Sequence, residues 1–228
     1  MKHKIPCFCE ETFEVEASEE INLDSEPDYL DEILKGGFFN FKCPGCGKKH
    51  KPEFPLSVLW PSKNFCFEVL PELERETFYR RKKKPALKKP YKLETLIGYP
   101  EMAERLAIIR DGYEGAAVEA IKYYLHLKVE EEYPEKEIDI WYYGTCNPDE
   151  SEKTGENDPG RTESSRERLA LEFHIHGMKE SEVAVLKIPL SLYQKTYNDY
   201  KKRPKGEIYG ALRVHSYLSV KNIMRKKD

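Results

Sequence analysis

The sequence has no long apolar run and no recognisable catalytic motif. None of its hydrophobic stretches approaches the roughly 20 residues of a membrane-spanning helix. Lys2 and Lys4 are not followed by the apolar segment of a secretory signal. Gly-rich phosphate loops, nucleophile elbows and zinc-protease helices are also missing. These absences predict a cytoplasmic protein without membrane attachment, and they leave an enzymatic activity undecided but not favoured.

Composition and charge suggest how the chain is divided. Its 228 residues are 39% hydrophobic and 35% charged, which suits one large domain or two small ones. Residues 75–92 contain nine Lys and Arg and one Glu, although the whole chain has a formal charge of −3. Residues 147–167 lack large apolar side chains and predict a mobile loop. We expect an N-terminal domain (1–79), a basic linker (80–92) and a C-terminal domain (93–228).

The spacing of apolar residues predicts an α+β fold. Alternating apolar residues indicate strands, and apolar residues three or four positions apart indicate amphipathic helices. Strands are expected at 13–17, 64–70, 137–143, 169–177 and 182–188. Helices are expected at 25–37, 99–111, 114–134, 190–202 and 217–227. Ser25 and Ser219 are the expected N-caps of the first and last of these helices.

Four of the six cysteines form two close pairs. Cys7 and Cys9 lie near the start of the chain, and Cys43 and Cys46 follow within the turn sequence CPGCG. Four thiolates around one ion form a closed tetrahedral site with Zn–S distances of about 2.3 Å. In a straight strand residues i and i+2 point to one face, so a C-x-C pair can also converge. The helix expected at 25–37 fills the gap between the pairs, which predicts a zinc-ribbon-like unit with an inserted helix.

The favoured interpretation is a structural zinc site with Cys7, Cys9, Cys43 and Cys46 as its ligands. All four candidate ligands are sulfur, so no open position for catalysis is implied. A redox-active dithiol remains an alternative, because C-P-x-C is similar to a dithiol oxidoreductase turn, although no βαβ context accompanies it. Disulfides are the third alternative.

The run from Pro6 to Glu72, with both cysteine pairs and the segment between them, resembles the bacterial CpXC domain. The segment 96–125 is similar to the helical extension of longer CpXC proteins. The resemblance implies cysteine-bound zinc and no established activity. The first motif is C-x-C where the family pattern is C-P-x-C, so His3 or His50 is an alternative ligand to Cys7.

Two histidines offer a second candidate metal site. His174 and His176 share one face of the strand expected at 169–177, and His215 or Glu172 could supply a third ligand. This arrangement would suit a metal-dependent hydrolase. The alternative interpretation is an ordinary polar face of a sheet.

The basic segment and the remaining cysteines give weaker evidence of a function. Tyr79 and Tyr91 flank the basic residues of 79–92, which could contact the phosphates and bases of nucleic acid. The alternative is a solvated linker against the acidic N-terminal domain. Cys66 and Cys146 lack a close partner, and Cys66 is expected in the core.

Three functions are therefore considered. The favoured one is a zinc-stabilised, non-enzymatic cytoplasmic interaction protein with an unknown protein partner. Nucleic-acid binding through residues 79–92 and metal-dependent hydrolysis through His174 and His176 are the alternatives.

Overall fold

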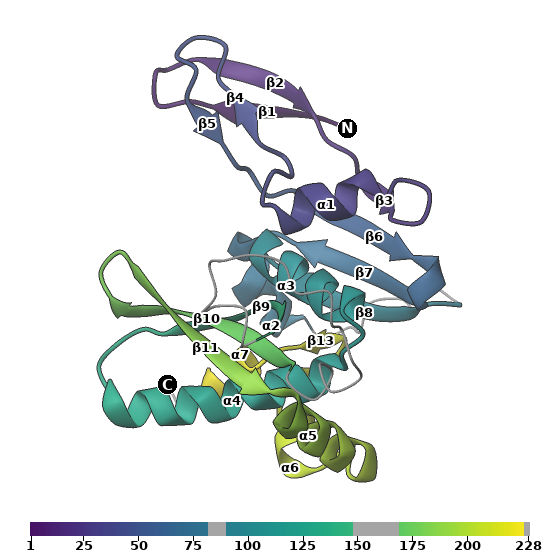
Figure 1. Cartoon of the computed structure of the whole chain (residues 1–228). Helices are drawn as coiled ribbons and strands as arrows, with labels where there is room; N and C mark the ends of the chain where they lie inside the picture. Colours follow the sequence, from purple (N-terminus) through teal and green to yellow (C-terminus); the bar gives the residue numbers. More distant parts are fainter. Residues whose placement is uncertain (82–89, 148–168, 226–228) are drawn as a thin grey trace, which may run out of the picture. The chain divides into compact units, whose positions relative to one another are not determined.

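The computed structural model describes residues 1–81, 90–147 and 169–225, and these divide into two compact units (Figure 1). Unit 1 consists of Met1–Leu106 and Val214–Tyr217, and unit 2 of Ala107–Arg213 and Leu218–Asp228. Both units contain helices and strands, which confirms the α+β class. The division falls within one helix, α3 (Tyr99–Arg110).

This division differs from the boundary expected at residues 80–92. Residues 82–89 and 148–168, which hold most of the basic segment and of the expected loop, lie outside the described residues. At the end of the basic segment, β8 (Lys92–Ile97) begins and pairs in parallel with β7 (Phe65–Leu70). A parallel pair requires a crossover connection. Residues 71–91 therefore connect two neighbouring strands of one sheet in unit 1.

Unit 1 combines two small hairpins with a larger mixed sheet. The hairpins are β1–β2 and β4–β5, and the larger sheet has the order β12-β13-β8-β7-β6-β3. The remaining elements of this part of the chain are β1 (Lys2–Pro6), β2 (Thr12–Glu16), β3 (Glu20–Asn22), α1 (Asp28–Leu34), β4 (Phe41–Lys42), β5 (Lys49–His50), β6 (Leu56–Trp60), η1 (Pro61–Lys63), η2 (Glu72–Glu74), α2 (Arg75–Arg80), β12 (Arg213–Val214) and β13 (Tyr217–Leu218).

Several expectations for this region are confirmed, and one is wrong. Strands β2 and β7 and helix α1 lie where alternation and helical spacing predict them. Ser25 does not cap α1, because its hydroxyl donates to the carbonyl of Asn22 and Pro27 occupies the cap position. Strand β6 was not anticipated, although buried Leu56, Val58 and Trp60 alternate along it.

The central strands of the large sheet are buried on both faces. In β7, Cys66 and Phe67 are neighbours in sequence, so they point to opposite faces, yet both are buried. One face packs against α2, where buried Phe78 joins Leu70 and Ile97. Strands buried on both faces are typical of sheets that helices cover. The expected core position of Cys66 is confirmed.

A buried polar network anchors β13 in unit 1. The side chain of Tyr217 is fully buried, and its hydroxyl donates to Glu101 at 2.9 Å. Arg75 donates to that hydroxyl at 2.7 Å and to Glu101 at 2.8 Å. Desolvation lowers the pKa of Arg75, but Glu72 and Glu101 raise it more, so the guanidinium stays charged. Burying these groups is tolerable because each is paired.

Tyr217→Phe should lower the free energy of unfolding by about 1–2 kcal/mol, because a buried hydrogen-bonded hydroxyl is lost and Arg75 loses a partner. Urea unfolding followed by circular dichroism measures the change. Tyr29→Phe is the matched control in unit 1, since it retains the ring contact with Phe38. Equal stability of the two variants would contradict the role of the network.

Unit 2 is built on a three-stranded antiparallel sheet of order β11-β10-β9. The strands and long helices expected in this unit are confirmed, whereas α6 was not predicted from the sequence. The elements are α4 (Gly115–Glu132), β9 (Asp139–Cys146), β10 (Ala170–Lys179), β11 (Glu182–Pro189), α5 (Leu190–Lys202), α6 (Glu207–Ala211) and α7 (Lys221–Met224). The last helix is shorter than expected, and its N-cap is Val220 and not Ser219, although the Ser219 hydroxyl accepts from the Lys221 N–H at 3.2 Å.

Helix α4 is the central element of unit 2. Its small residues Ala116 and Ala120 are fully buried against Leu212 and Leu218. The same helix buries Glu119, which accepts a hydrogen bond from the Val220 N–H at 2.7 Å. The carboxylate therefore satisfies a backbone donor near the start of α7. Apolar and polar contacts together fix the C-terminal segment to α4.

Burial also shifts the ionisation of His126 in α4. Desolvation and the charge of Lys122 lower the pKa of His126 to about 4, despite the opposite effects of Asp139, Glu119 and Glu130. The unfolded chain binds a proton at this histidine below a pH of about 6.5. Between these values only the unfolded state is protonated there, so the stability contribution present at neutral pH is lost as the pH falls.

Replacing His126 should remove this dependence. The stability of the natural protein relative to His126→Gln should fall by about 3 kcal/mol from pH 7 to pH 4 and change little below that. Urea unfolding of both proteins at each pH measures the difference. A difference that stays constant across this range would contradict the shifted pKa of His126.

None of the helices among the described residues is long and apolar enough to cross a membrane.

Candidate metal centre

Two hairpins from distant parts of the sequence bring the four cysteines together. Cys7 and Cys9 lie in the loop between β1 and β2, and Cys43 and Cys46 lie in the loop between β4 and β5 (Figure 1). Helix α1 and strand β3 occupy the sequence between the hairpins, as the inserted helix of the sequence interpretation requires. The cysteines are therefore held at the turns of two separate β-ribbons.

The two turns differ in length by one residue. In the second turn the Gly47 N–H donates to the Cys43 carbonyl at 2.9 Å, four residues back. In the first turn the Glu10 N–H donates to the Cys7 carbonyl at 3.0 Å, only three residues back. Both donors have positive φ, 69° at Glu10 and 71° at Gly47. A tighter turn therefore accommodates the shorter C-x-C spacing.

The first cysteine pair converges for a different reason from the strand alternation that the sequence predicts. Strand β1 ends at Pro6, so Cys7 and Cys9 are turn residues and are not alternating residues of one strand. The backbone bond between Cys7 N–H and the Glu11 carbonyl, at 2.8 Å, closes the base of the loop. Equivalent closure in the second loop comes from Cys43 N–H and the Lys48 carbonyl, at 2.9 Å.

The four sulfur atoms have a spacing suited to one metal ion. Each Sγ lies within 4.8 Å of the others, with 3.5 Å between Cys7 and Cys46 and 3.6 Å between Cys9 and Cys43. Four sulfurs at about 2.3 Å from a tetrahedral ion would be about 3.8 Å apart. Cys7 and Cys43 are buried, whereas Cys9 and Cys46 are exposed. The residues present therefore fit a tetrahedral ion with four sulfur ligands.

The backbone of the second turn favours the ionised form of Cys43. Desolvation raises the pKa of Cys43, but the N–H groups of Cys46 and Gly45 and the thiols of Cys7 and Cys9 lower it to about 7. Backbone N–H groups that point at a sulfur stabilise the thiolate, which is the form that binds metal. The turn thus supplies both the geometry and the electrostatics of a ligand.

His50 contacts the sulfur of Cys7. Its Nε2 is 3.2 Å from the Cys7 Sγ, and its ring meets Phe13 edge to face. A thiolate can only accept a hydrogen bond, so His50 donates when Cys7 is ionised. His3, the other histidine considered as an alternative ligand, instead stacks on Phe54 with ring centroids 4.0 Å apart. His50 therefore supports the cluster from outside the four-sulfur group.

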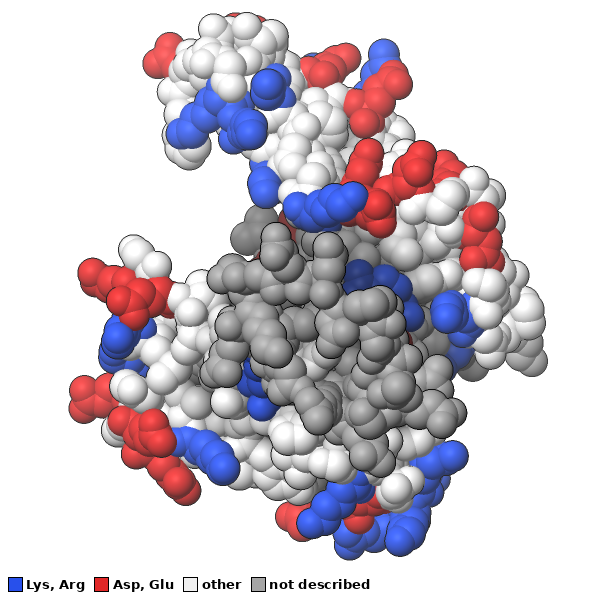
Figure 2. All heavy atoms as spheres, viewed as in Figure 1, with Lys and Arg blue, Asp and Glu red and all other residues white. Residues whose placement is uncertain are grey.

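Basic and aromatic side chains surround the turns. Lys48 lies over the ring of Phe8, with 4.2 Å between its Nζ and the ring centroid, which links the two loops. Lys42 and Lys49 flank the second pair in sequence, and Figure 2 shows basic side chains on the side of unit 1 where β5 lies. Four thiolates carry more negative charge than one divalent ion balances. Nearby lysines reduce that excess.

The histidine pair of unit 2 does not form a comparable group. His174 and His176 share the polar face of β10 as expected. His174 contacts Glu172 at 2.9 Å and stacks on Tyr143. In the part of the chain that the structure describes, the four cysteines are the sole group of three or more potential ligands close enough to share an ion. The hydrolase interpretation gains no support from these residues.

The other predicted candidates are partly described. At the ends of the basic segment, Arg81 pairs with Glu74 at 2.9 Å, and Lys92 lies over the ring of Phe65. Residues 82–89 lie outside the described residues, so nucleic-acid binding there stays a prediction. Cys146 is partly buried at the end of β9, where desolvation raises its pKa and so disfavours the reactive thiolate.

Comparison with known proteins agrees with the cysteine geometry. The model of the CpXC protein family matches residues 5–122, which include both cysteine turns, the large sheet strands β6 to β8 and α3. The chain belongs to the CpXC family. An uncharacterized protein of Treponema pallidum (strain Nichols) is 25% identical to this CpXC protein over 241 residues, covering 96% of this chain and 97% of the relative. No solved structure matches.

His50→Phe should weaken metal binding by about tenfold, because removal of a hydrogen bond to a ligand typically costs 10–100-fold in affinity. The phenyl ring retains the edge contact with Phe13, so the change isolates the N–H group. Competition between the protein and a chromophoric chelator measures the affinity. His3→Phe is the matched control and should bind as the natural protein does. Equal losses in both variants would show that the effect is not specific to Cys7.

Proposed function

We propose that this CpXC protein is a zinc-stabilised, non-enzymatic interaction protein of the cytoplasm that binds a protein partner. The observation that carries the proposal is the group of four sulfur atoms within 4.8 Å of one another. Tetrahedral sets of four sulfurs select zinc or iron among biological metals. Zinc is the proposed ion because two separate cysteine turns with four thiolates form its usual structural site.

The ligand set supports a structural role. Catalytic zinc sites use three protein ligands and keep one position for water or substrate. Here Cys7, Cys9, Cys43 and Cys46 would fill all four positions. The bound ion would stabilise the folded state by joining β1–β2 to β4–β5, two hairpins with short strands. Isolated two-stranded hairpins are marginally stable in water, so a covalent or metal link has a clear physical benefit.

Exposed apolar side chains support an interaction role. Phe8 is 87% exposed within the first cysteine turn, and Leu73 is 97% exposed in η2. Zinc would hold the loop that presents Phe8 in one conformation. A rigid exposed aromatic residue binds a partner at a low entropic cost. The second cysteine turn contributes Lys48, which would add a positive charge beside that aromatic surface.

Metal analysis of the purified native protein tests this function. We expect about one zinc ion per chain, because one group of four thiolates saturates the tetrahedral coordination of zinc. Cys43→Ser should lose the ion and a large part of the stability of unit 1, measured by mass spectrometry of the metal and by thermal unfolding. Cys146→Ser, which lies outside the cluster, should retain the ion and serves as the control.

Bound iron, or much less than one zinc per chain, would contradict the proposal. So would full metal content and unchanged stability in Cys43→Ser.

A further inference from the structure

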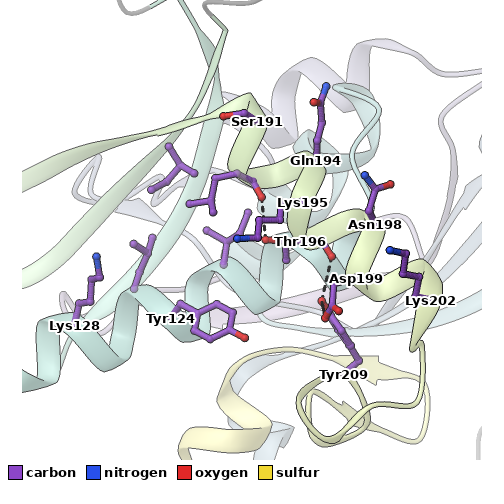
Figure 3. A pocket seen from close by; sticks show the side chains of 14 residues that line it. Tyr124, Lys128, Ser191, Gln194, Lys195, Thr196, Asn198, Asp199, Lys202 and Tyr209 are labelled. Carbon is purple, nitrogen blue, oxygen red and sulfur yellow. Dashed lines mark hydrogen bonds between the residues drawn. The ribbon is translucent and has the colours of Figure 1, made fainter.

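Unit 2 contains a groove between helices α4 and α5 (Figure 3). Its volume is about 870 Å³, and β11 and α6 supply the remaining walls. In α4 the lining residues Ile121, Tyr124, Leu125 and Lys128 occupy positions i, i+3, i+4 and i+7, so they form one stripe along the helix. A matching stripe lines the groove from α5. The groove therefore runs along both helices for about two turns, or roughly 10 Å.

The groove has an apolar floor and partly exposed apolar walls. Ile121, Leu125 and Ile188 are buried at its base. Tyr124 and Leu192 are 49% and 44% exposed, although both line the groove. Large apolar side chains that converge on a concave surface are typical of binding sites. These residues would lose further apolar surface to water if another chain packed between the helices.

The charge along the groove is positive. Lys128 lines it from α4, and Lys195 and Lys202 line it from α5. The acidic lining residue, Asp199, forms an ion pair with Arg203 and accepts a hydrogen bond from the Tyr209 hydroxyl. Within the described ranges, Lys128 and Lys195 form no ion pair. Figure 2 also shows basic side chains at the lower edge, where Figure 1 places α5 and α6.

The positions of the lysines distinguish between possible occupants. Lys195 and Lys202 are seven residues apart on α5, which separates their Cα atoms by about 10 Å. Lys128 lies towards one end of the groove and Lys202 towards the other (Figure 3). A ligand with one anionic group can meet only one end of this row. An extended occupant with several negative charges and one apolar face can meet all three lysines and the apolar floor.

From this charge complementarity we infer that the α4–α5 groove docks an acidic amphipathic helix of a partner protein. Such a helix would place leucine-like residues at positions i, i+3, i+4 and i+7 against the floor, and Glu or Asp beside the lysines. The inference deepens the proposed function and depends on it, because it assigns the chemistry of a protein partner and a second surface, in unit 2, that would bind it.

Two synthetic helical peptides test the inference with the natural full-length protein. The probe is a fluorescein-labelled peptide of roughly 15 residues, with leucines at i, i+3, i+4 and i+7 and glutamates at the flanking positions. The comparison peptide has the same leucines and lysines in place of the glutamates. Fluorescence anisotropy should show at least about tenfold tighter binding of the acidic peptide, with weaker binding in high salt. Equal binding of the two peptides, or no binding of either, would overturn the inference.

Charge reversal locates the site. The double variant Lys128→Glu with Lys195→Glu should bind the acidic peptide at least about tenfold more weakly and the basic peptide more tightly. Lys205→Glu is the matched control, since it changes charge in the same unit outside the groove lining and should change peptide preference little. Unchanged preference in the double variant would refute this location.

A further pair of readouts separates this inference from its alternatives. Tight binding of dodecanoate, lost in the double variant and without selective peptide binding, would identify a small-molecule pocket and contradict helix docking. Zinc content is measured on the same samples. Absence of peptide binding with about one zinc per chain refutes only the groove, whereas absence of zinc refutes the proposed function.

Discussion

The close approach of four cysteine sulfurs is the constraint on which the N-terminal part of this protein depends. The Sγ atoms of Cys7, Cys9, Cys43 and Cys46 lie within 4.8 Å of one another, and ionised sulfurs at that spacing need a cation between them. The hairpins that carry them have few backbone pairs of their own. A bound ion would therefore convert a repulsive cluster into the main link between the two ribbons, and it would fix the conformation of the loop that exposes Phe8.

Away from the cysteines, buried polar groups select one arrangement of the chain. In unit 1 the Tyr217 hydroxyl meets Glu101 and Arg75, and in unit 2 Glu119 accepts the Val220 N–H. Both networks hold segments close to the C-terminal end against elements that lie about 100 residues or more earlier in the sequence. Paired polar groups contribute modestly to stability, but an unpaired one is costly, so alternative packings of these segments are disfavoured.

The cysteine cluster and the groove would give the two units different roles. Unit 1 would hold its shape through metal and present an aromatic residue. Unit 2 presents an apolar groove with Lys128, Lys195 and Lys202 along it. Net charge alone would not suggest an acidic partner, because the whole chain carries −3. The arrangement of lysines along the groove would favour an acidic partner, since charge interactions between exposed groups fade over about 10 Å.

Local pattern in the sequence determined the cysteine pairs, the long helices α3, α4 and α5 and the strands β7, β9, β10 and β11, because periodicity and turn residues act over a few positions. The tighter turn at Glu10 that accommodates C-x-C and the contact of His50 with Cys7 were decided only in the tertiary structure. So were the pairing of β7 with β8 and the groove between α4 and α5. These features depend on residues that are distant in sequence, and their pairing is set by which packing buries apolar surface and satisfies every buried polar group.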